Sequence, residues 1–304
     1  MKIEKSKKTG VHKTIAIKII MVVLFVSGLM TFAYPFLSDA INGLHDQAVI
    51  DNYKKEYNDL SKQEQENRLN KLKIENKKLL ENNELTNIPG MGTVKDPFAS
   101  ESKKSELANK DNVKKHIIGA IFIPAIKVSL PLFDETNDAF LDEGATVLQG
   151  SSFPIGGIGT HSVITGHTGV PEKKLFTDLN KLKKGDVFYI QVEGKKLAYQ
   201  INNFKTVLPN ELDSLKIDRH LDQVTLVTCT PYMINTHRLL VTGYRVPYVG
   251  EKLNQQINAT KQYQFKRIML YSFLLLVLVL FIIYIFWRIL FKSKKEDSIP
   301  TKKP

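Results

Sequence analysis

Two long apolar segments lie near the two ends of the chain, and shorter apolar and polar stretches alternate between them. Residues 19–37 are almost wholly apolar, and residues 268–287 carry no charge and are rich in Leu, Ile, Val and Phe. As a helix, each is long enough to cross the roughly 30 Å hydrocarbon core of a bilayer. The pattern predicts two transmembrane helices, and it leaves open that the first is a cleaved signal peptide.

Basic tails flank the two apolar segments on their outer sides. Residues 1–18 and 288–304 are rich in lysine, and cationic flanks favour the cytoplasmic side of a membrane. With both tails inside, the region between the spans lies outside. We therefore predict a multi-pass protein of the cell membrane with an extracytoplasmic central region.

Residues 38–88 are predicted to be helical. No Gly or Pro occurs from residue 44 to residue 88, and Tyr and Leu recur at roughly helical spacing among many charged and amide side chains. The apolar face is thin. The pattern leaves open whether this segment pairs with a partner helix in a coiled coil or lies on the domain that follows.

Residues 89–115 are predicted to form a loop. Two Pro and two Gly fall in its first part, and a polar run follows. Loops of this length without secondary structure are usually functional or disordered. The aromatic Phe98, next to Asp96 and Pro97, points to a function for this loop.

Residues 116–250 show the pattern of short strands. Apolar runs at 117–123 and 126–132 are separated by a proline, and a helical turn is expected at 138–143. The pair Glu193-Gly194 predicts a hairpin. Many short strands with Gly and Pro turns indicate a mainly β fold, a barrel or a sandwich, followed by a linker at 251–267. The other expected strands are 162–165, 186–192, 196–207, 224–228 and 239–246.

Three residues at predicted strand ends carry reactive side chains. Cys229 is the only cysteine, and it is either a small buried hydrophobe or a nucleophile. His167 follows a turn-forming glycine, and Arg238 begins the strand after Cys229, so a pairing of those strands would make the two neighbours. Alone, each has a structural interpretation. Together, a thiol, an imidazole and a guanidinium supply the nucleophile, the proton carrier and the oxyanion stabiliser of acyl transfer.

Composition argues against several other classes. The net charge is +12, but no basic stripe is interleaved with aromatics, so nucleic-acid binding is not expected. Attraction to an anionic membrane or cell-wall surface is the better interpretation. The sequence has no paired His and Cys spacing of a zinc site, no Asp-rich calcium loop and no phosphate-binding glycine loop, so no metal or cofactor is expected.

The motifs around the three reactive residues resemble those of the sortase family. The stretch Thr-Leu-Val-Thr-Cys, which ends at Cys229, resembles the sortase signature TLxTC, and the segments around His167 and Arg238 are similar to the family's other catalytic positions. The resemblance runs from about residue 118 to residue 246. It implies a closed sortase-type β-barrel with short helices, preceded by the helical segment and flanked by the two spans.

Further features resemble class C, the pilus-assembling sortases. These are the C-terminal span, the long helical segment before the barrel, and the run Asp96-Pro97-Phe98, which resembles the lid of that class. The resemblance implies that Asp96 pairs with Arg238 and that Phe98 covers Cys229.

The resemblance also implies a reaction at a Gram-positive-type cell surface. Cys229 would cleave an LPxTG-like sorting signal between Thr and Gly, and an acceptor lysine of a pilin subunit would resolve the thioester. His167 would be the acid and base, and Arg238 would stabilise the oxyanion. Thr228 and Thr230 either shape the pocket or are ordinary strand threonines. A sortase that anchors surface proteins to peptidoglycan and a non-enzymatic membrane-bound assembly scaffold stay open as alternatives.

Overall fold

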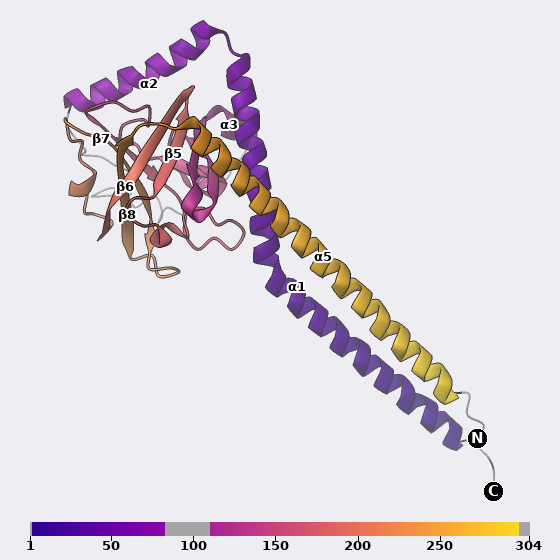
Figure 1. Cartoon of the computed structure of the whole chain (residues 1–304). Coiled ribbons are helices and arrows are strands. Elements are labelled where there is room, and N and C mark those ends of the chain that lie inside the picture. Colours follow the sequence, from indigo (N-terminus) through magenta and orange to yellow (C-terminus); the bar gives the residue numbers. More distant parts are fainter. Residues whose placement is uncertain (1, 83–109, 298–304) are drawn as a thin grey trace. The chain divides into compact units, whose positions relative to one another are not determined.

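The computed structural model describes residues 2–82 and 110–297, which form two compact units (Figure 1). The barrel unit is Ile41–Gln264, and the helical unit joins Met1–Ala40 to Phe265–Pro304. The helices are α1 (Lys2–Asp59), α2 (Lys62–Asn82), α3 (Lys110–Lys115), α4 (Asp138–Glu143) and α5 (Gly250–Asp297). The strands are β1 (Ile117–Ile123), β2 (Val128–Phe133), β3 (Ala145–Val147), β4 (Thr160–Thr165), β5 (Val187–Val192), β6 (Lys195–Val207), β7 (Asp222–Thr230) and β8 (His237–Val246).

The strands close into a barrel in the order β1-β2-β3-β4-β7-β8-β6-β5. Neighbouring strands are antiparallel except for β2 with β3 and β4 with β7, which are parallel. Closure gives every strand two partners, so the barrel presents no unpaired strand edge. The predicted mainly β closed barrel with short helices is therefore confirmed.

Strand β1 shows how the helices of this unit cover the barrel. Every residue of β1 is buried, because its inner face, including Ile121, joins the barrel core, while Phe122 on its outer face packs with Ile50 of α1 and Leu253 of α5. A strand that is covered on both faces reads as a continuous apolar run. This accounts for the unbroken apolar run at this point of the sequence.

Local sequence signals decide several turns of the barrel unit. Glu193 and Gly194 both have positive φ, 43° and 71°, as the two-residue turn of a twisted hairpin requires, and they join β5 to β6 as predicted. Asn137 accepts a hydrogen bond at its Oδ1 from the backbone N–H of Phe140 at 3.0 Å, and so caps the expected helical turn, α4. Strand β3 was not predicted, because three residues are too few to show a period.

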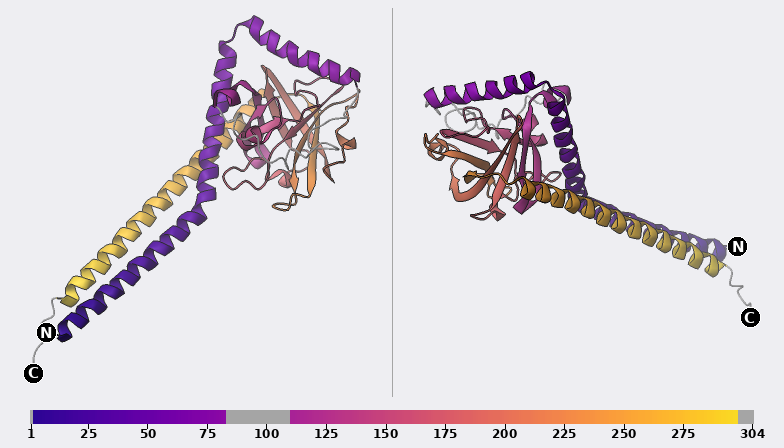
Figure 2. Two further views of the ribbon diagram at one scale, coloured as in Figure 1. Left: turned by 180° about the vertical axis from the view of Figure 1, so that it is seen from behind. Right: turned by 45° about the horizontal axis from the view of Figure 1, so that its top comes forward.

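Helix α2 lies on the barrel, which settles the alternative that the sequence left open (Figures 1 and 2). Leu69 and Leu72 pack against the main core cluster. The side-chain amide of Asn76 donates to the carbonyl of Phe153 at 2.9 Å and accepts from its N–H at 2.7 Å. The thin apolar face of this helix is enough to hold it on the barrel, because polar contacts add to the apolar ones.

A charge pair also holds α2 on the barrel. The guanidinium of Arg68 donates from Nε and from its second terminal nitrogen to Oε1 of Glu193, at 3.0 and 2.7 Å. The side chain of Glu193 is only 2% exposed, whereas that of Arg68 is 40% exposed. Burial raises the pKa of the Glu193 carboxyl, and the neighbouring guanidinium opposes this rise.

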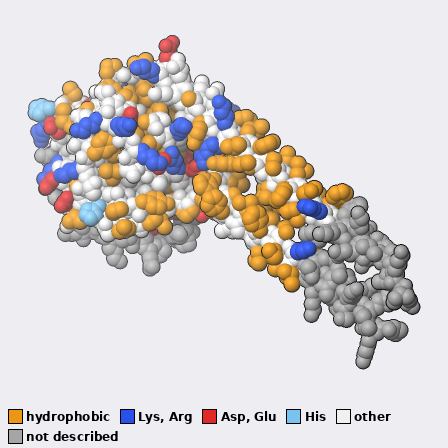
Figure 3. Space-filling model, turned by 60° about the horizontal axis from the view of Figure 1, so that its bottom comes forward, with side chains coloured by type: hydrophobic (Ala, Val, Ile, Leu, Met, Phe, Trp, Pro, Cys, Tyr) orange, Lys and Arg blue, Asp and Glu red, His pale blue; other side chains and the backbone are white. Residues whose placement is uncertain are grey.

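The helical unit consists of the first part of α1 and the last part of α5, which run side by side (Figure 2). Its apolar side chains are largely exposed, and Figure 3 shows them gathered along the two helices. By length and composition, both helices are suited to cross a membrane. Arg267 of α5 donates to Oδ2 of Asp39 of α1 at 2.7 Å. Residues 251–267, expected as a linker, are helical and belong to α5.

Candidate active site

Cys229 and Arg238 face each other across two paired strands. Strands β7 and β8 are antiparallel, and their register sets Cys229 directly opposite Arg238, as the short connection between them predicted. Both residues are buried, with 8% of Cys229 and 2% of Arg238 exposed. The guanidinium of Arg238 donates to the backbone carbonyls of Asn235 and His237 at 3.0 and 3.1 Å. The β7–β8 connection therefore holds the guanidinium in place.

His167 lies at the same end of the barrel, two residues beyond the end of strand β4. Strand β4 runs parallel to β7, with Thr165 opposite Val227. Two residues further along the chain stand His167, which is just past β4, and Cys229, which is still within β7. The Thr228 hydroxyl donates to the carbonyl of Gly166 at 2.7 Å, so it ties the backbone next to His167 to the backbone next to Cys229. Three residues that are distant in the sequence thus lie at the ends of three neighbouring strands.

Gly166 is required at its position by the close approach of the Phe176 ring to its backbone. A Cβ atom there would lie 2.8 Å from two ring atoms of Phe176, which is shorter than a carbon–carbon contact allows. The N–H of Phe176 in turn donates to the carbonyl of His167 at 3.0 Å. The glycine therefore lets the Phe176 ring pack directly against the backbone next to His167.

Acidic side chains of α4 lie close to the imidazole. Oδ1 of Asp142 is 3.7 Å from Nε2 of His167, which is too long for a direct hydrogen bond. Burial lowers the pKa of His167, while the charges of Asp142 and Asp138 oppose this change. The lowered pKa favours the neutral imidazole, which is the form that can accept a proton. The sequence offered no acidic partner for His167, because the predicted helical turn at 138–143 could not be placed beside it.

The remaining candidate residues have different surroundings. Thr228 is buried, and its hydroxyl supports the backbone at Gly166. Thr230 pairs with His237 at the end of the β7–β8 ladder. The lid residues Asp96, Pro97 and Phe98 lie outside the described residues. Within the described ranges, no group of three or more His, Cys, Asp or Glu side chains is arranged to hold a metal ion.

Comparisons with known proteins agree with the motifs. A family model described as Sortase domain matches residues 121–246. Sortase A of Bacillus anthracis is 30% identical over 139 residues, which are 46% of this chain and 64% of that protein. A solved structure of Streptococcus pneumoniae sortase C is 37% identical with a TM-score of 0.56, and it covers 67% of this chain and 98% of its own.

A second solved structure extends the comparison. Clostridium perfringens sortase C, solved with the C-terminal cell wall sorting motif, is 38% identical with a TM-score of 0.53. The match covers 66% of this chain and 99% of that one. The chain therefore spans less than two thirds of the curated relative but nearly the whole of both solved chains.

Proposed function

Because this chain belongs to the sortase family and is similar to its class C members, we propose that it is a cysteine transpeptidase that joins pilin subunits. The observation that carries the proposal is the meeting of three groups at one end of the barrel. The chain's only thiol, Cys229, stands opposite a buried guanidinium, and His167 follows the neighbouring strand β4, which pairs with the strand of Cys229. Each of these groups has a distinct part in acyl transfer.

The first half-reaction forms an acyl-enzyme. The Cys229 thiol gives its proton to His167, and the sulfur attacks the threonine carbonyl carbon of an LPxTG-like sorting signal. Arg238 stabilises the negative oxygen of the tetrahedral intermediate. The bond between threonine carbon and glycine nitrogen then breaks, and His167 returns the proton to the leaving amine. The product is a thioester on Cys229.

The second half-reaction resolves the thioester. A lysine side-chain amine of a pilin subunit loses a proton to His167, and its nitrogen attacks the thioester carbon. An isopeptide bond forms, the carbon–sulfur bond breaks, and the sulfur takes the proton back from His167. The lowered pKa of His167 suits this role, because it favours the neutral imidazole and an imidazolium could not accept the proton of the incoming amine.

The same proposal places the barrel unit outside the cell. Sortases act at the cell surface, and two helices of this chain are suited to cross a membrane. With the basic tails in the cytoplasm, Cys229 would face the cell wall, where sorting signals and pilin lysines are presented. This topology is testable by labelling Cys229 in intact cells with a thiol reagent that does not cross the membrane.

The test of the function is a comparison of the full chain with its Cys229→Ala variant. We expect the parent chain to form a thioester with a sorting-signal peptide, detectable by mass, and to build high-molecular-weight pilin polymers. The Cys229→Ala variant should do neither. Polymers that persist in this variant contradict the proposal. Transfer to a peptidoglycan amine but not to pilin lysine would assign the chain to surface-protein anchoring instead.

The sequence-based lid proposal has its own test. Phe98→Ala removes the ring proposed to cover Cys229, and we expect a thiol reagent to alkylate Cys229 faster in this variant than in the parent chain. Asp96→Ala should act in the same direction by removing the charge proposed to hold Arg238. Equal alkylation rates in all three chains would exclude a shielding lid. A thiol that never reacts would favour the assembly scaffold.

A further inference from the structure

Residues 168–175 form a loop that leaves the barrel at His167 and returns beside it, and we call them the His167 loop. The N–H of Phe176 donates to the carbonyl of His167 at 3.0 Å, which closes the loop. Leu175 and Phe176 belong to the main core cluster, and Val170 packs against this cluster. Both ends of the loop are therefore fixed on the barrel, next to the imidazole that the proposed reaction uses.

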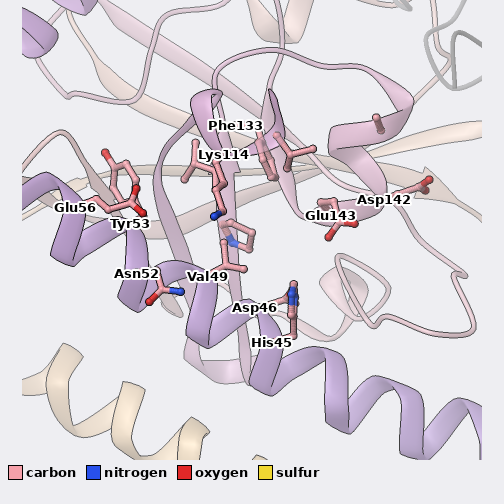
Figure 4. A pocket seen from close by; sticks show the side chains of 14 residues that line it. His45, Asp46, Val49, Asn52, Tyr53, Glu56, Lys114, Phe133, Asp142 and Glu143 are labelled. Atoms are coloured by element: carbon pink, nitrogen blue, oxygen red, sulfur yellow. The ribbon is translucent and has the colours of Figure 1, made fainter. Parts of the chain in front are cut away.

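Two residues in the middle of the His167 loop are held by helices α1 and α4. The side-chain amide of Asn42 in α1 donates to the carbonyl of Glu172 at 2.8 Å. Nζ of Lys173 lies 3.6 Å from Oδ1 of Asp46 in α1 and 3.0 Å from Oε2 of Glu143 in α4. It also donates to the backbone carbonyl of Glu143 at 3.3 Å. Asp46 and Glu143 line one cavity between these helices, and Figure 4 shows them at the same end of it.

The ammonium of Lys173 is enclosed where α1, α4 and the His167 loop meet. Its side chain is 12% exposed, and that of Asp46 is 6% exposed. Lysine is rarely buried to this degree unless carboxylates pair with it, because an unpaired ammonium loses its hydration. The two carboxylates therefore determine where Lys173 lies, and with it the middle of the loop.

Helix α4 connects Lys173 to the imidazole. Glu143 binds Lys173, and the residue before it, Asp142, has its Oδ1 3.7 Å from Nε2 of His167. The helix itself is fixed on β2, because an aromatic ring of each is stacked on the other with centroids 5.0 Å apart. One fixed helix thus contacts both the middle of the loop and the residue from which the loop starts.

From this geometry we infer that Lys173 is a positioning residue for His167. Its ammonium, bound by Asp46 and Glu143, docks the His167 loop on α1 and α4. The docked loop holds the imidazole where it can exchange a proton with Cys229. Such an exchange requires hydrogen-bond reach, and a misplacement of about 1 Å can lower a rate on the order of 100-fold. The inference rests on the proposed function and adds how its proton carrier is kept in place.

The test compares variants of the full chain in detergent, with a sorting-signal peptide as acyl donor. Two quantities are measured: the maximal rate of thioester formation and the peptide concentration that gives half of this rate. Lys173→Met removes the charge and keeps an unbranched stem, whereas Lys173→Arg keeps a cation that can bind both carboxylates. Lys181→Met is the matched control, because Lys181 is 67% exposed and pairs with Asp178, and neither residue belongs to α1 or α4.

We expect Lys173→Met to lower the maximal rate about ten- to 100-fold, because a small displacement of the imidazole is enough for such a loss. The half-saturating peptide concentration should not change, because the loss concerns proton transfer and not peptide binding. Lys173→Arg should recover most of the rate, and Lys181→Met should match the parent chain. A parent-like maximal rate in Lys173→Met overturns the inference. So does a loss confined to the half-saturating concentration, or an arginine variant as slow as the methionine variant.

Hydrogen exchange separates positioning from a general loss of stability. In Lys173→Met the amide of Phe176, whose hydrogen bond closes the His167 loop, should exchange faster, while the amides of β7 and β8 should exchange as in the parent chain. A rate loss accompanied by faster exchange throughout the barrel would assign Lys173 a purely structural role and would overturn the inference.

A second variant decides if Lys173→Met does not fold. Glu143→Gln removes one carboxylate charge that is 45% exposed, so we expect a maximal rate about two- to fivefold lower, and a parent-like rate overturns the inference. A parent chain that forms no thioester would refute the proposed function. A parent chain that forms it no faster than Lys173→Met refutes only the positioning role.

Discussion

Replacing Arg68 by leucine tests how α2 is held on the barrel. The change removes both N–H donors to Glu193, whose side chain is 2% exposed. Oε2 of that carboxylate has no hydrogen-bond partner among the described residues. The variant therefore leaves a buried negative charge on the hairpin turn without its cationic partner. We expect α2 to detach more often.

The size of the effect follows from two limits. Removing one partner of a buried ion pair costs about 3–5 kcal/mol. Here Arg68 is 40% exposed, so solvent already screens part of the pair. Glu193 can also avoid the buried charge by binding a proton. At pH 7 this costs a carboxyl with the ordinary pKa of 4.5 about 3.4 kcal/mol, so the destabilisation by the buried charge cannot exceed about that amount. We expect a loss of about 2 kcal/mol, or about 30-fold in the opening equilibrium of α2.

The pH dependence has a definite sign. Burial raises the pKa of Glu193 in the folded chain, and loss of Arg68 removes the charge that opposes this rise. A carboxyl whose folded pKa is raised is easier to bury when protonated. The loss of α2 docking stability in Arg68→Leu is therefore complete at a pH above the raised pKa of Glu193. It shrinks as the pH falls towards the ordinary pKa of the carboxyl.

Hydrogen exchange of the α2 amides in the full chain measures this opening. The protection factors of parent and variant are compared with each other first at pH 7 and then at pH 5. Lys71→Leu, at an exposed position of the same helix, controls for the change to leucine. The Arg68→Leu/Glu193→Gln double variant should recover most of the protection, because no charge is left buried. Protection within twofold of the parent at pH 7, or a deficit that is the same at pH 5, would refute this reasoning.

Three further changes test the active-site geometry. Asp142→Asn removes the nearer charge that opposes the lowering of the His167 pKa, so the limb of the pH–rate profile that His167 controls should move to lower pH, and an unchanged profile would rule out the coupling. Gly166→Ala should destabilise the chain by about 1–3 kcal/mol because its Cβ would press on Phe176, and an unaltered melting temperature in detergent would disprove the contact. Thr228→Val should cost about 1–3 kcal/mol and slow thioester formation, because a buried carbonyl loses its donor, and parent-like values of both would argue against this support.

Sequence alone determined the elements whose signals are local. The apolar runs of β1 and β7, the Glu193-Gly194 hairpin and the helical turn of α4 each depend on neighbours a few residues away, and the structure has them where they were predicted. The prediction that Cys229 and Arg238 are neighbours also succeeded, because one short connection between two strands leaves little choice of pairing.

Tertiary structure alone decided which distant groups meet. The position of α2 on the barrel depends on the hydrogen bonds of Asn76 with the backbone of Phe153 and on the ion pair of Arg68 with Glu193. The acidic neighbour of His167 likewise reaches its place only once α4 packs against β2. Burial and charge act over a few ångströms in space whatever the separation along the chain, so these features become fixed only when the barrel closes.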